Sequence, residues 1–536
     1  MKYLLLFIST LLSAQITLEQ ISSKPPSRAK NFLIWQYLRQ DITPQQATEA
    51  FSQIRDVDTR LFFAYAKKSG SKEIQYAADC MRAKTNELLN LNADCLQMAI
   101  SPVKAAQFSK EQREVFLKKI SLKQTQAYLE IMNSDKSEET LMRYKAGDVL
   151  KIMTDSGKKF RELNFNRDYS QKFINFLASS QKVSRLIDLA ANYDSLDKLQ
   201  NSLLQLEGSK LNFEGTFMLS LIALKHDKKD QALKLLELCK AKASSLPLYR
   251  DKTLFWQYLV THDKHYLRTL SLSMDINIYT LYAKEVLNIE IQNYFTEEQP
   301  RLVNDEKDLK DPFVWLDIRK VISSAPRHNL FSLADKYTKQ KLLPIKSMAL
   351  ERAYSYKMHG FIMPYTDYTS QFSKENRAFM YALMRQESHF IPSAISSSYA
   401  LGLMQLMPFL IDALEKKMPQ KIDTYNDLFD PQTNIEYAAR HLKWLTSQLN
   451  HPLLRAYAYN AGLGFVREYL KTHSFSQGKY EPFMSMEAMS NVQTREYGKK
   501  VLANYVMYKR IMGENVSIVH LFDTLKEQKQ TRRSAK

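Results

Sequence analysis

A single carboxylate stands between a predicted helix and a serine-rich segment in the stretch ALMRQESHFIPSAISSSYALGLMQLMPFL, residues 382–410. A carboxylic acid that keeps its proton near neutral pH can act as a general acid. Two effects predict a raised pKa for this residue, Glu387: the negative end of the helix dipole and partial burial among apolar groups. On the local sequence alone, an ordinary surface glutamate that ends a helix is the simpler interpretation.

The residues that follow Glu387 are typical of a ligand-binding loop. Gly402 removes a side chain where the backbone would approach a ligand. Met404 fills apolar space, Gln405 offers a donor and an acceptor, and Pro408 is expected to end the element. These types in this order favour a functional interpretation of the nearby acid.

A second polar group occurs in RAYAYNAGLG, residues 455–464. Tyr459 and Asn460 are predicted at a helix end, with Gly462 and Gly464 as stop signals. One acid, a glycine-led loop with a glutamine, and a Tyr-Asn helix end together suit a sugar-binding cleft.

Amphipathic helices are expected to position these residues. Ser373 is a predicted N-cap for a helix that carries Glu387 in its last turn. Asp430 caps a later helix with an inward apolar face made of Ile435, Ala438, Leu442 and Leu445. We predict one compact domain over residues 371–525.

The preceding region, residues 15–370, predicts helix after helix. Residues 213–245 form a clear helical pair joined by HDKKD, and such pairs must bury their faces on neighbours, as in a solenoid. An irregular helical bundle is the alternative. The fold class is therefore all-α: an N-terminal helical superhelix followed by an α-helical domain.

The composition and the two ends of the chain limit where the protein can be located and which partners it can bind. The net charge of +19 over 536 residues suits a polyanion, although a solvated basic surface explains it equally well. No nucleic-acid fold signature accompanies the charge, so we expect no nucleic-acid partner. Residues 1–14 resemble a secretory signal peptide, no later segment is long enough to span a bilayer, and no lipid-anchor cysteine follows. Residues 526–536 predict a basic, disordered tail.

The cysteines and histidines add little. Cys80 and Cys95 could pair, and buried free thiols are an equal alternative. His262 and His265 have metal-like spacing but no further ligand, so an exposed turn is the better interpretation. We expect no metal and no cofactor.

Three motifs resemble those of a known family. ES at residues 387–388, SSSYALGLMQLMP at 396–408 and AYNAG at 458–462 are similar to the soluble lytic transglycosylases. The resemblance implies a goose-type lysozyme fold for the catalytic domain, preceded by a helical superhelix that family members of this length often close into a ring. Together with the signal-like residues 1–14, it predicts an exported, periplasmic enzyme without a stable membrane anchor. Such an enzyme acts on peptidoglycan glycan strands and can have other cell-wall enzymes as partners.

The resemblance implies a chemical role for each matched residue. Glu387 would protonate the glycosidic oxygen between N-acetylmuramic acid and N-acetylglucosamine. It would then act as base on the muramoyl 6-hydroxyl, which gives a 1,6-anhydro end. The implied substrate-binding residues are Ser396, Met404, Gln405, Tyr459, Asn460 and Glu487. The family's small-Ile-Pro stretch after the last of these is Ala488-Met489-Ser490 here, so a surface glutamate is an equal alternative at Glu487.

The residues themselves agree with this chemistry. Ordinary glycosidases use two carboxylates, yet no acidic residue lies between Glu387 and Asp412. This favours an intramolecular transfer over hydrolysis, although Asp423, Asp427 or Asp430 could fold back towards the cleft. A lysozyme-like hydrolase and a non-enzymatic cell-wall scaffold are the competing hypotheses.

Overall fold

A computed structural model describes the chain in two compact units. It covers residues 15–243, 246–299, 308–339, 342–418, 421–472, 475 and 478–527. Unit 1 consists of residues 1–78, 293–450 and 504–515, and unit 2 consists of residues 79–292, 451–503 and 516–536. The predicted signal peptide and residues 528–536 of the predicted tail lie outside the described residues.

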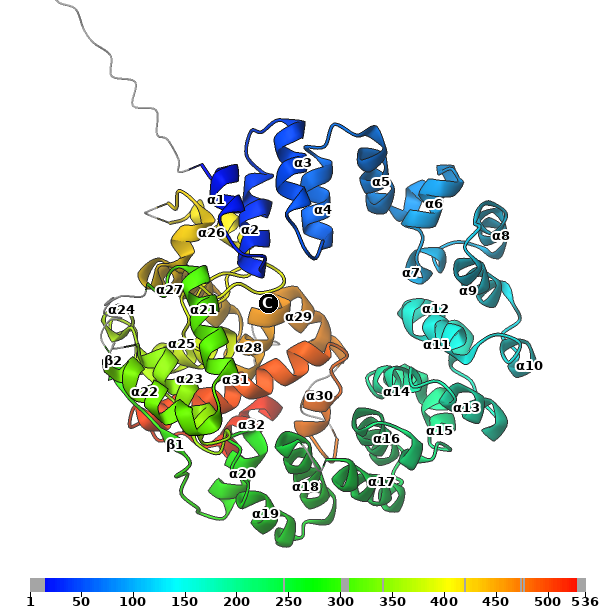
Figure 1. Cartoon of the computed structure of the whole chain (residues 1–536). Helices are drawn as coiled ribbons and strands as arrows, with labels where there is room; N and C mark the ends of the chain where they lie inside the picture. Colours follow the sequence, from blue (N-terminus) through cyan, green and yellow to red (C-terminus); the bar gives the residue numbers. More distant parts are fainter. Residues whose placement is uncertain are drawn as a thin grey trace, which may run out of the picture. The chain divides into compact units, whose positions relative to one another are not determined.

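The secondary structure of unit 1 is mainly helical (Figure 1). They are α1 (Leu18–Ser22), α2 (Arg28–Tyr37), α3 (Pro44–Ser52), α4 (Thr59–Ala66), α21 (Pro312–Ser324), α22 (Leu330–Lys339), α23 (Leu343–Ala353), α24 (Thr366–Thr369), α25 (Lys374–Glu387), α26 (Pro408–Glu415) and α27 (Pro431–Gln448). The 3₁₀ turns are Arg327–Asn329 and Tyr425–Phe429. Two short parallel pairs join β1 (Tyr294–Phe295) to β3 (His359–Gly360) and β2 (Glu298–Gln299) to β4 (Met363–Pro364).

Among the described residues of unit 2, every secondary-structure element is a helix. Its helices are α6 (Ala93–Ala99), α7 (Pro102–Ala105), α8 (Lys110–Lys119), α9 (Lys123–Asn133), α10 (Glu138–Leu141), α11 (Ala146–Asp155), α12 (Lys158–Phe165), α13 (Gln171–Ala178), α14 (Val183–Ala191), α15 (Asp197–Leu203), α16 (Phe213–Lys225), α17 (Lys229–Lys242), α18 (Pro247–Thr261), α19 (Lys264–Ser271), α20 (Ile278–Val286), α28 (Pro452–Ala461), α29 (Leu463–Thr472), α30 (Phe483–Glu487) and α32 (Ile518–Glu527). The 3₁₀ turns are Thr85–Asn90, Asp194–Leu196 and Gly208–Lys210. Two further helices, α5 (Lys72–Arg82) and α31 (Val492–Ile511), run through a boundary between the units.

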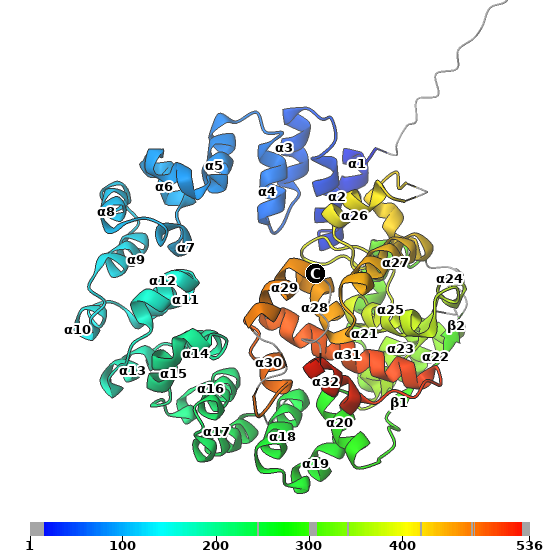
Figure 2. The same ribbon diagram turned by 180° about the vertical axis from the view of Figure 1, so that it is seen from behind.

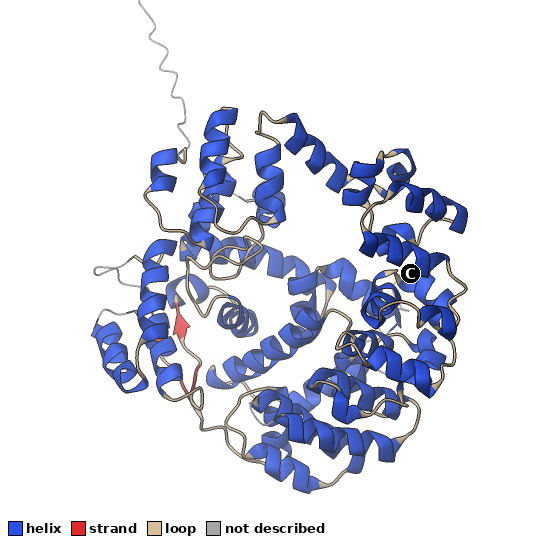
Figure 3. Ribbon diagram, turned by 45° about the vertical axis from the view of Figure 1, so that its right-hand side comes forward, coloured by secondary structure: helices blue, strands red, loops and turns tan. Residues whose placement is uncertain are grey.

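The N-terminal helices of unit 2 stack on their neighbours in chain order. Helices α16 to α20 each contact the next, and they follow one another in both ribbon views (Figures 1 and 2). Helix α16 is buried on nearly all sides, whereas α17 buries the stripe Ala232, Leu235, Leu236 and Cys239. Colouring by secondary structure shows how little of the chain is strand (Figure 3). The predictions of an all-α chain and of stacked helical pairs are therefore confirmed.

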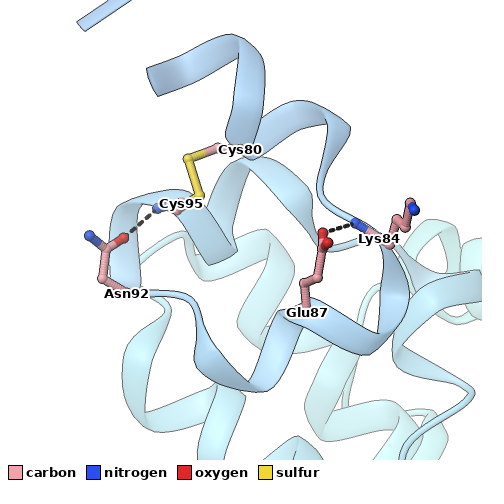
Figure 4. Close-up of a disulfide and its surroundings, with 5 residues drawn as sticks. All are labelled: Cys80, Lys84, Glu87, Asn92 and Cys95. Atoms are coloured by element: carbon pink, nitrogen blue, oxygen red, sulfur yellow. Dashed lines mark hydrogen bonds between the residues drawn. A yellow bond between two sulfur atoms is a disulfide. The ribbon is translucent and has the colours of Figure 1, made fainter. Parts of the chain in front are cut away.

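A disulfide joins the first helices of unit 2. Cys80 of α5 and Cys95 of α6 are bonded, with their Cα atoms 4.9 Å apart, and both are buried (Figure 4). The side-chain oxygen of Asn92 accepts a hydrogen bond from the Cys95 amide at 3.0 Å and caps α6. Of the two alternatives that the sequence left open, the structure shows the pair, while Cys239 is a buried free thiol.

Two structural predictions from the sequence are wrong in detail. Pro408 begins α26 instead of ending an element, because its fixed φ suits the first turn of a helix. Lys526 and Glu527, which we assigned to the disordered tail, form the end of α32. Among the described residues, no helix combines the length and the apolar character that crossing a membrane requires.

Candidate active site

In unit 1, Glu387 is the last residue of helix α25. Ser373 caps the helix by accepting a hydrogen bond from the Asn376 amide, as predicted. After Glu387 the chain leaves the helix because His389 and Phe390 adopt positive φ values of 50° and 65°. The side chain of Glu387 is half-buried. A carboxyl group at this helix end is partly withdrawn from water and partly accessible.

Arg385 anchors the same end of α25. Its guanidinium donates to the Gly360 carbonyl at 2.9 Å and to the Asn504 side chain at 3.1 Å. It also forms an ion pair with Glu351 at 3.0 Å. Three segments of unit 1 therefore fix the helix turn that carries Glu387.

The segment after α25 folds into a tight double hairpin. Leu401 forms isolated antiparallel bridges with Ile395 and with Leu406. The side-chain amide of Gln405 donates to the carbonyls of Ala394 at 3.0 Å and of Gly402 at 2.8 Å. Gln405 thus braces the loop on which it lies. The hydroxyl of Ser388, next to Glu387, donates to the Leu403 carbonyl at 2.9 Å and ties the loop to the helix end.

Gly402 makes room for a protein side chain, which corrects our prediction that it clears space for a ligand. An added Cβ would lie 2.1 Å from the Asn434 side-chain nitrogen and 2.4 Å from the Leu428 carbonyl oxygen. The residue also has a φ of +75°. Both the space and the conformation therefore demand glycine at this position.

Asn434 of α27 is a key residue that the sequence analysis missed. It is fully buried, and its side-chain oxygen accepts from the Met404 amide at 2.9 Å. Its side-chain nitrogen donates to the carbonyls of Leu401 at 3.1 Å and Leu428 at 3.0 Å. The sequence feature that could have revealed this role is a polar asparagine next to Ile435, on the inward face of the predicted helix. Met404, an implied substrate-binding residue, is itself 0% exposed, so it supports the loop from within.

Two N-terminal helices hold the part of the loop that contains Ser396. The Ser396 hydroxyl accepts from the amides of Ser398 at 3.1 Å and Ala400 at 2.9 Å. From α4, Arg60 donates to the Ser397 carbonyl at 3.0 Å, and from α2, Arg28 donates to the Ile395 carbonyl at 3.4 Å.

The ring of Tyr399 anchors the same loop in the core of unit 1. It packs against Phe32 and Trp35 of α2, with ring centroids 5.4 and 5.6 Å away. No local pattern in the sequence pointed to these long-range contacts.

Tyr459 and Asn460 lie at the end of α28 in unit 2, as predicted. Gly462 ends that helix with a φ of +87°. Gly464 is no stop signal, since α29 begins at Leu463 and includes it. The side-chain oxygen of Asn460 accepts from the Thr494 hydroxyl of α31 at 2.8 Å. Both Tyr459 and Asn460 are half-buried.

Glu487 is buried, and its predicted contact with substrate does not fit this geometry. It is 1% exposed, and its carboxylate contacts Lys499 at 2.9 Å and Lys252 at 3.5 Å. The Tyr279 hydroxyl donates to the same carboxylate. Although burial opposes its charge, Lys252 and Lys499 hold the pKa of Glu487 below its usual value. Glu487 thus belongs to a buried charge network, which comprises Asp188, Lys252, Tyr279, Glu487, Arg495, Glu496 and Lys499.

The predicted site residues fall into two groups. Unit 1 brings Glu387 together with the loop that holds Ser396, Met404 and Gln405, through the hydrogen bond from Ser388 to Leu403. Unit 2 carries the remaining three, which are Tyr459, Asn460 and Glu487. In the described residues, no group of histidine, cysteine and acidic side chains has the geometry of a metal site.

Comparisons with known proteins agree with the motifs. Residues 365–481 match the family model described as transglycosylase SLT domain. The soluble lytic murein transglycosylase of Salmonella typhimurium is 28% identical over 184 residues, which are 33% of this chain and 28% of that protein. A putative soluble lytic murein transglycosylase of Haemophilus influenzae is 34% identical over 138 residues, 26% of this chain and 23% of that protein. The matched region thus spans about a quarter of these curated relatives.

A solved structure is similar over most of the chain. It is an inactive mutant of the lytic transglycosylase Slt from Pseudomonas aeruginosa, which aligns with 93% of this chain and 84% of its own at a TM-score of 0.51. At 15% identity this likeness shows a shared fold. The resemblance drawn from the three motifs is confirmed: residues 365–481 match the transglycosylase SLT domain, and the similar curated proteins are soluble lytic murein transglycosylases.

Proposed function

We propose that this protein is an exported peptidoglycan lytic transglycosylase. It would cleave the β-1,4 bond between N-acetylmuramic acid and N-acetylglucosamine and leave 1,6-anhydromuramoyl ends. The observation that carries the proposal is the match of residues 365–481 to the transglycosylase SLT domain, since this segment contains Glu387 and the braced loop beside it.

Glu387 would supply both proton transfers. It would first donate its proton to the glycosidic oxygen as the bond to C1 breaks, and the carboxylate formed would then take the proton of the muramoyl 6-hydroxyl. The oxygen of that hydroxyl attacks C1, and no water is consumed. One carboxylate suffices because the nucleophile belongs to the substrate, unlike in glycosidases that use two.

Two of the three acids that could have served as a second carboxylate, Asp427 and Asp430, have structural contacts. Asp427 accepts hydrogen bonds from the Asp423 and Thr424 amides at 2.7 and 2.9 Å. Asp430 caps α27 through the Thr433 amide at 3.1 Å and pairs with Lys310 at 3.3 Å. These contacts support the single-carboxylate mechanism.

The remaining residues would bind and orient the glycan. Ser396 and Gln405 fix the loop beside Glu387, and Tyr459 and Asn460 would contact the sugar from the end of α28. Met404 and Glu487 are buried, so Met404 would support the loop and Glu487 the end of α30 without contact to the glycan. The partners proposed are glycan strands and, through the basic surface, other cell-wall enzymes.

Digestion of purified sacculi tests the proposal. Wild type should release muropeptides with 1,6-anhydro ends, and Glu387→Gln should abolish release while leaving the circular dichroism spectrum unchanged. Glu375→Gln, an exposed residue in the first turn of the same helix, is the matched control and should keep activity. Products heavier by one water, with reducing ends, would show a lysozyme-like hydrolase instead. Binding to sacculi without soluble product would show a scaffold.

Export to the periplasm is part of the proposal. The buried Cys80–Cys95 disulfide supports it, because structural disulfides are typical of oxidising compartments. Fractionation combined with thiol labelling tests the location: the protein should appear with periplasmic markers and carry one reactive thiol after denaturation, that of Cys239. Recovery with cytoplasmic markers and three reactive thiols would contradict it.

A further inference from the structure

The buried charge network joins the N-terminal helices of unit 2 to its C-terminal segment. Lys252 of α18 lies 3.5 Å from Glu487 at the end of α30 and 3.2 Å from Glu496 of α31. Tyr279 of α20 donates its hydroxyl to Glu487. Lys252 is 1% and Tyr279 2% exposed, so water has almost no access to these contacts. They fix the end of α30 and the first turns of α31 against the preceding helices.

Arg495 adds a second link within the network. Its guanidinium forms an ion pair with Asp188 of α14 at 2.8 Å. The same nitrogen donates to the carbonyls of Glu487 at 3.0 Å and Met489 at 3.3 Å. The connection between α30 and α31 is therefore held to a third N-terminal helix.

The first turn of α31 also contacts the proposed site. Thr494, next to Arg495, donates its hydroxyl to the Asn460 side-chain oxygen at 2.8 Å. Gly498, one turn later, lies so close to Tyr457 of α28 that an added Cβ would come within 2.1 Å of its ring. Any shift of this turn would reach the end of α28, where Tyr459 and Asn460 lie.

From these contacts we propose that Lys252 and Tyr279 are positioning residues for Tyr459 and Asn460. The two residues lie outside the transglycosylase domain and act through Glu487, Glu496 and the first turn of α31. The inference rests on the proposed function, since it assumes that Tyr459 and Asn460 contact the glycan. It assigns to the N-terminal helices a direct part in the geometry of the reaction.

The charges explain why the loss of Lys252 should move the turn. With Lys252 present, two buried lysines contact both Glu487 and Glu496. Without it, Lys499 is, among the described residues, the one lysine left to both carboxylates, at 2.9 and 2.8 Å, while Arg495 pairs with the Glu496 carboxylate at 3.5 Å. With side chains only 2% and 23% exposed, the two carboxylates then repel each other more strongly, and separation or solvation relieves that repulsion. Both separation and solvation of the carboxylates would displace α30 or α31.

Two variants and a control test the proposal on sacculi. Lys252→Met removes the charge at similar length, and Tyr279→Phe removes only the hydroxyl, which keeps the test valid if the first variant does not fold. Both should lower kcat, by about 10- to 100-fold for Lys252→Met, while KM for glycan strands changes little. Arg161→Met is the control: Arg161 is a buried cation of α12 that donates to the Met153 and Thr154 carbonyls, and its loss should leave kcat unchanged.

A double-mutant cycle tests the route of the effect. Thr494→Val breaks the contact to Asn460 and should itself lower kcat. If Tyr279 acts through that contact, Tyr279→Phe combined with Thr494→Val should lower kcat by less than the product of the two single effects. Independent, multiplicative effects would refute the route.

Amide hydrogen exchange tests whether these segments have shifted or loosened, and it does not depend on enzymatic activity. In Tyr279→Phe and in folded Lys252→Met, amides of residues 457–464 and 488–498 should exchange at least several-fold faster, while those of α11 to α13 should not change. Unchanged exchange in these segments overturns the inference even in an active enzyme. An inactive wild type with altered exchange in the variants would instead refute the proposed function and leave the positioning supported.

Discussion

Replacement of Gly402 by alanine should cost far more than its small size suggests. The backbone φ of +75° disfavours any residue with a Cβ, at about 1–2 kcal/mol. The new Cβ would also meet Asn434 at 2.1 Å and the Leu428 carbonyl at 2.4 Å. The Leu428 carbonyl belongs to the backbone and cannot move aside easily, so the Asn434 side chain must move instead. Its three hydrogen bonds, worth about 0.5–1.5 kcal/mol each, would be lost or weakened. We expect Gly402→Ala to lower the free energy of unfolding by about 3–6 kcal/mol in total.

A second glycine of unit 1 gives a matched control. Gly513 has a φ of +76°, but nothing lies within 4 Å of its added Cβ. Gly513→Ala should therefore show the backbone cost alone, about 1–2 kcal/mol. The difference between the two variants isolates the contact with Asn434.

Urea unfolding followed by circular dichroism measures both variants. Equal losses for Gly402→Ala and Gly513→Ala would refute the reasoning, because they would show that Asn434 yields without cost. The double variant Gly402→Ala with Asn434→Ala provides a further check. It should be less destabilised than the two single changes predict together, since the smaller side chain vacates the space that the new methyl group needs.

Two further predictions concern unit 2. Replacing Cys80 and Cys95 by serine opens a loop of sequence separation 15, which should lower the free energy of unfolding by about 3 kcal/mol. Urea unfolding should show this loss, and an equal loss when wild type is reduced; an unchanged midpoint would refute it. Burial lowers the pKa of His451 to about 4. Below pH 6.5 the imidazole of His451 takes up a proton in the unfolded chain but not in the native state. The free energy of unfolding should therefore be highest above pH 6.5 and fall as the pH declines towards 4. The loss amounts to about 3 kcal/mol. This pH-dependent loss should be absent from His451→Gln. Identical pH profiles of unfolding free energy for wild type and variant would contradict the lowered pKa of His451.

Local sequence signals predicted the elements well because their causes are local. Ser373 and Asp430 cap their helices through amides three residues away. The inward stripe of α27 follows from helical spacing, and its members Ile435, Ala438 and Leu445 are fully buried. The three family motifs identified the domain for a similar reason, since each lies within a short stretch.

Predictions failed where a residue's partner is distant in the sequence. The family resemblance assigned Glu487 to substrate, and nothing near it in the sequence pointed to its buried partner Tyr279, 208 residues away. Gly402 was assigned to ligand clearance because nothing in its neighbourhood pointed to Asn434, whose contact to Leu401 spans 33 residues. Spacing rules describe the backbone near a residue, whereas these roles depend on which helices the tertiary fold brings together.

The hold of α2 and α4 on the loop beside Glu387 has a consequence for the order of folding. Arg60 contacts Ser397, 337 residues later in the chain, and Arg28 contacts Ile395, 367 residues later. Phe32 and Trp35 bury their rings against Tyr399 and so lack this partner until the loop has been synthesised. Contacts of such separation are slow to form, because the chain between them must be ordered first. The first helices of unit 1 therefore complete their packing among the last, and their apolar faces depend on protection from aggregation in the meantime.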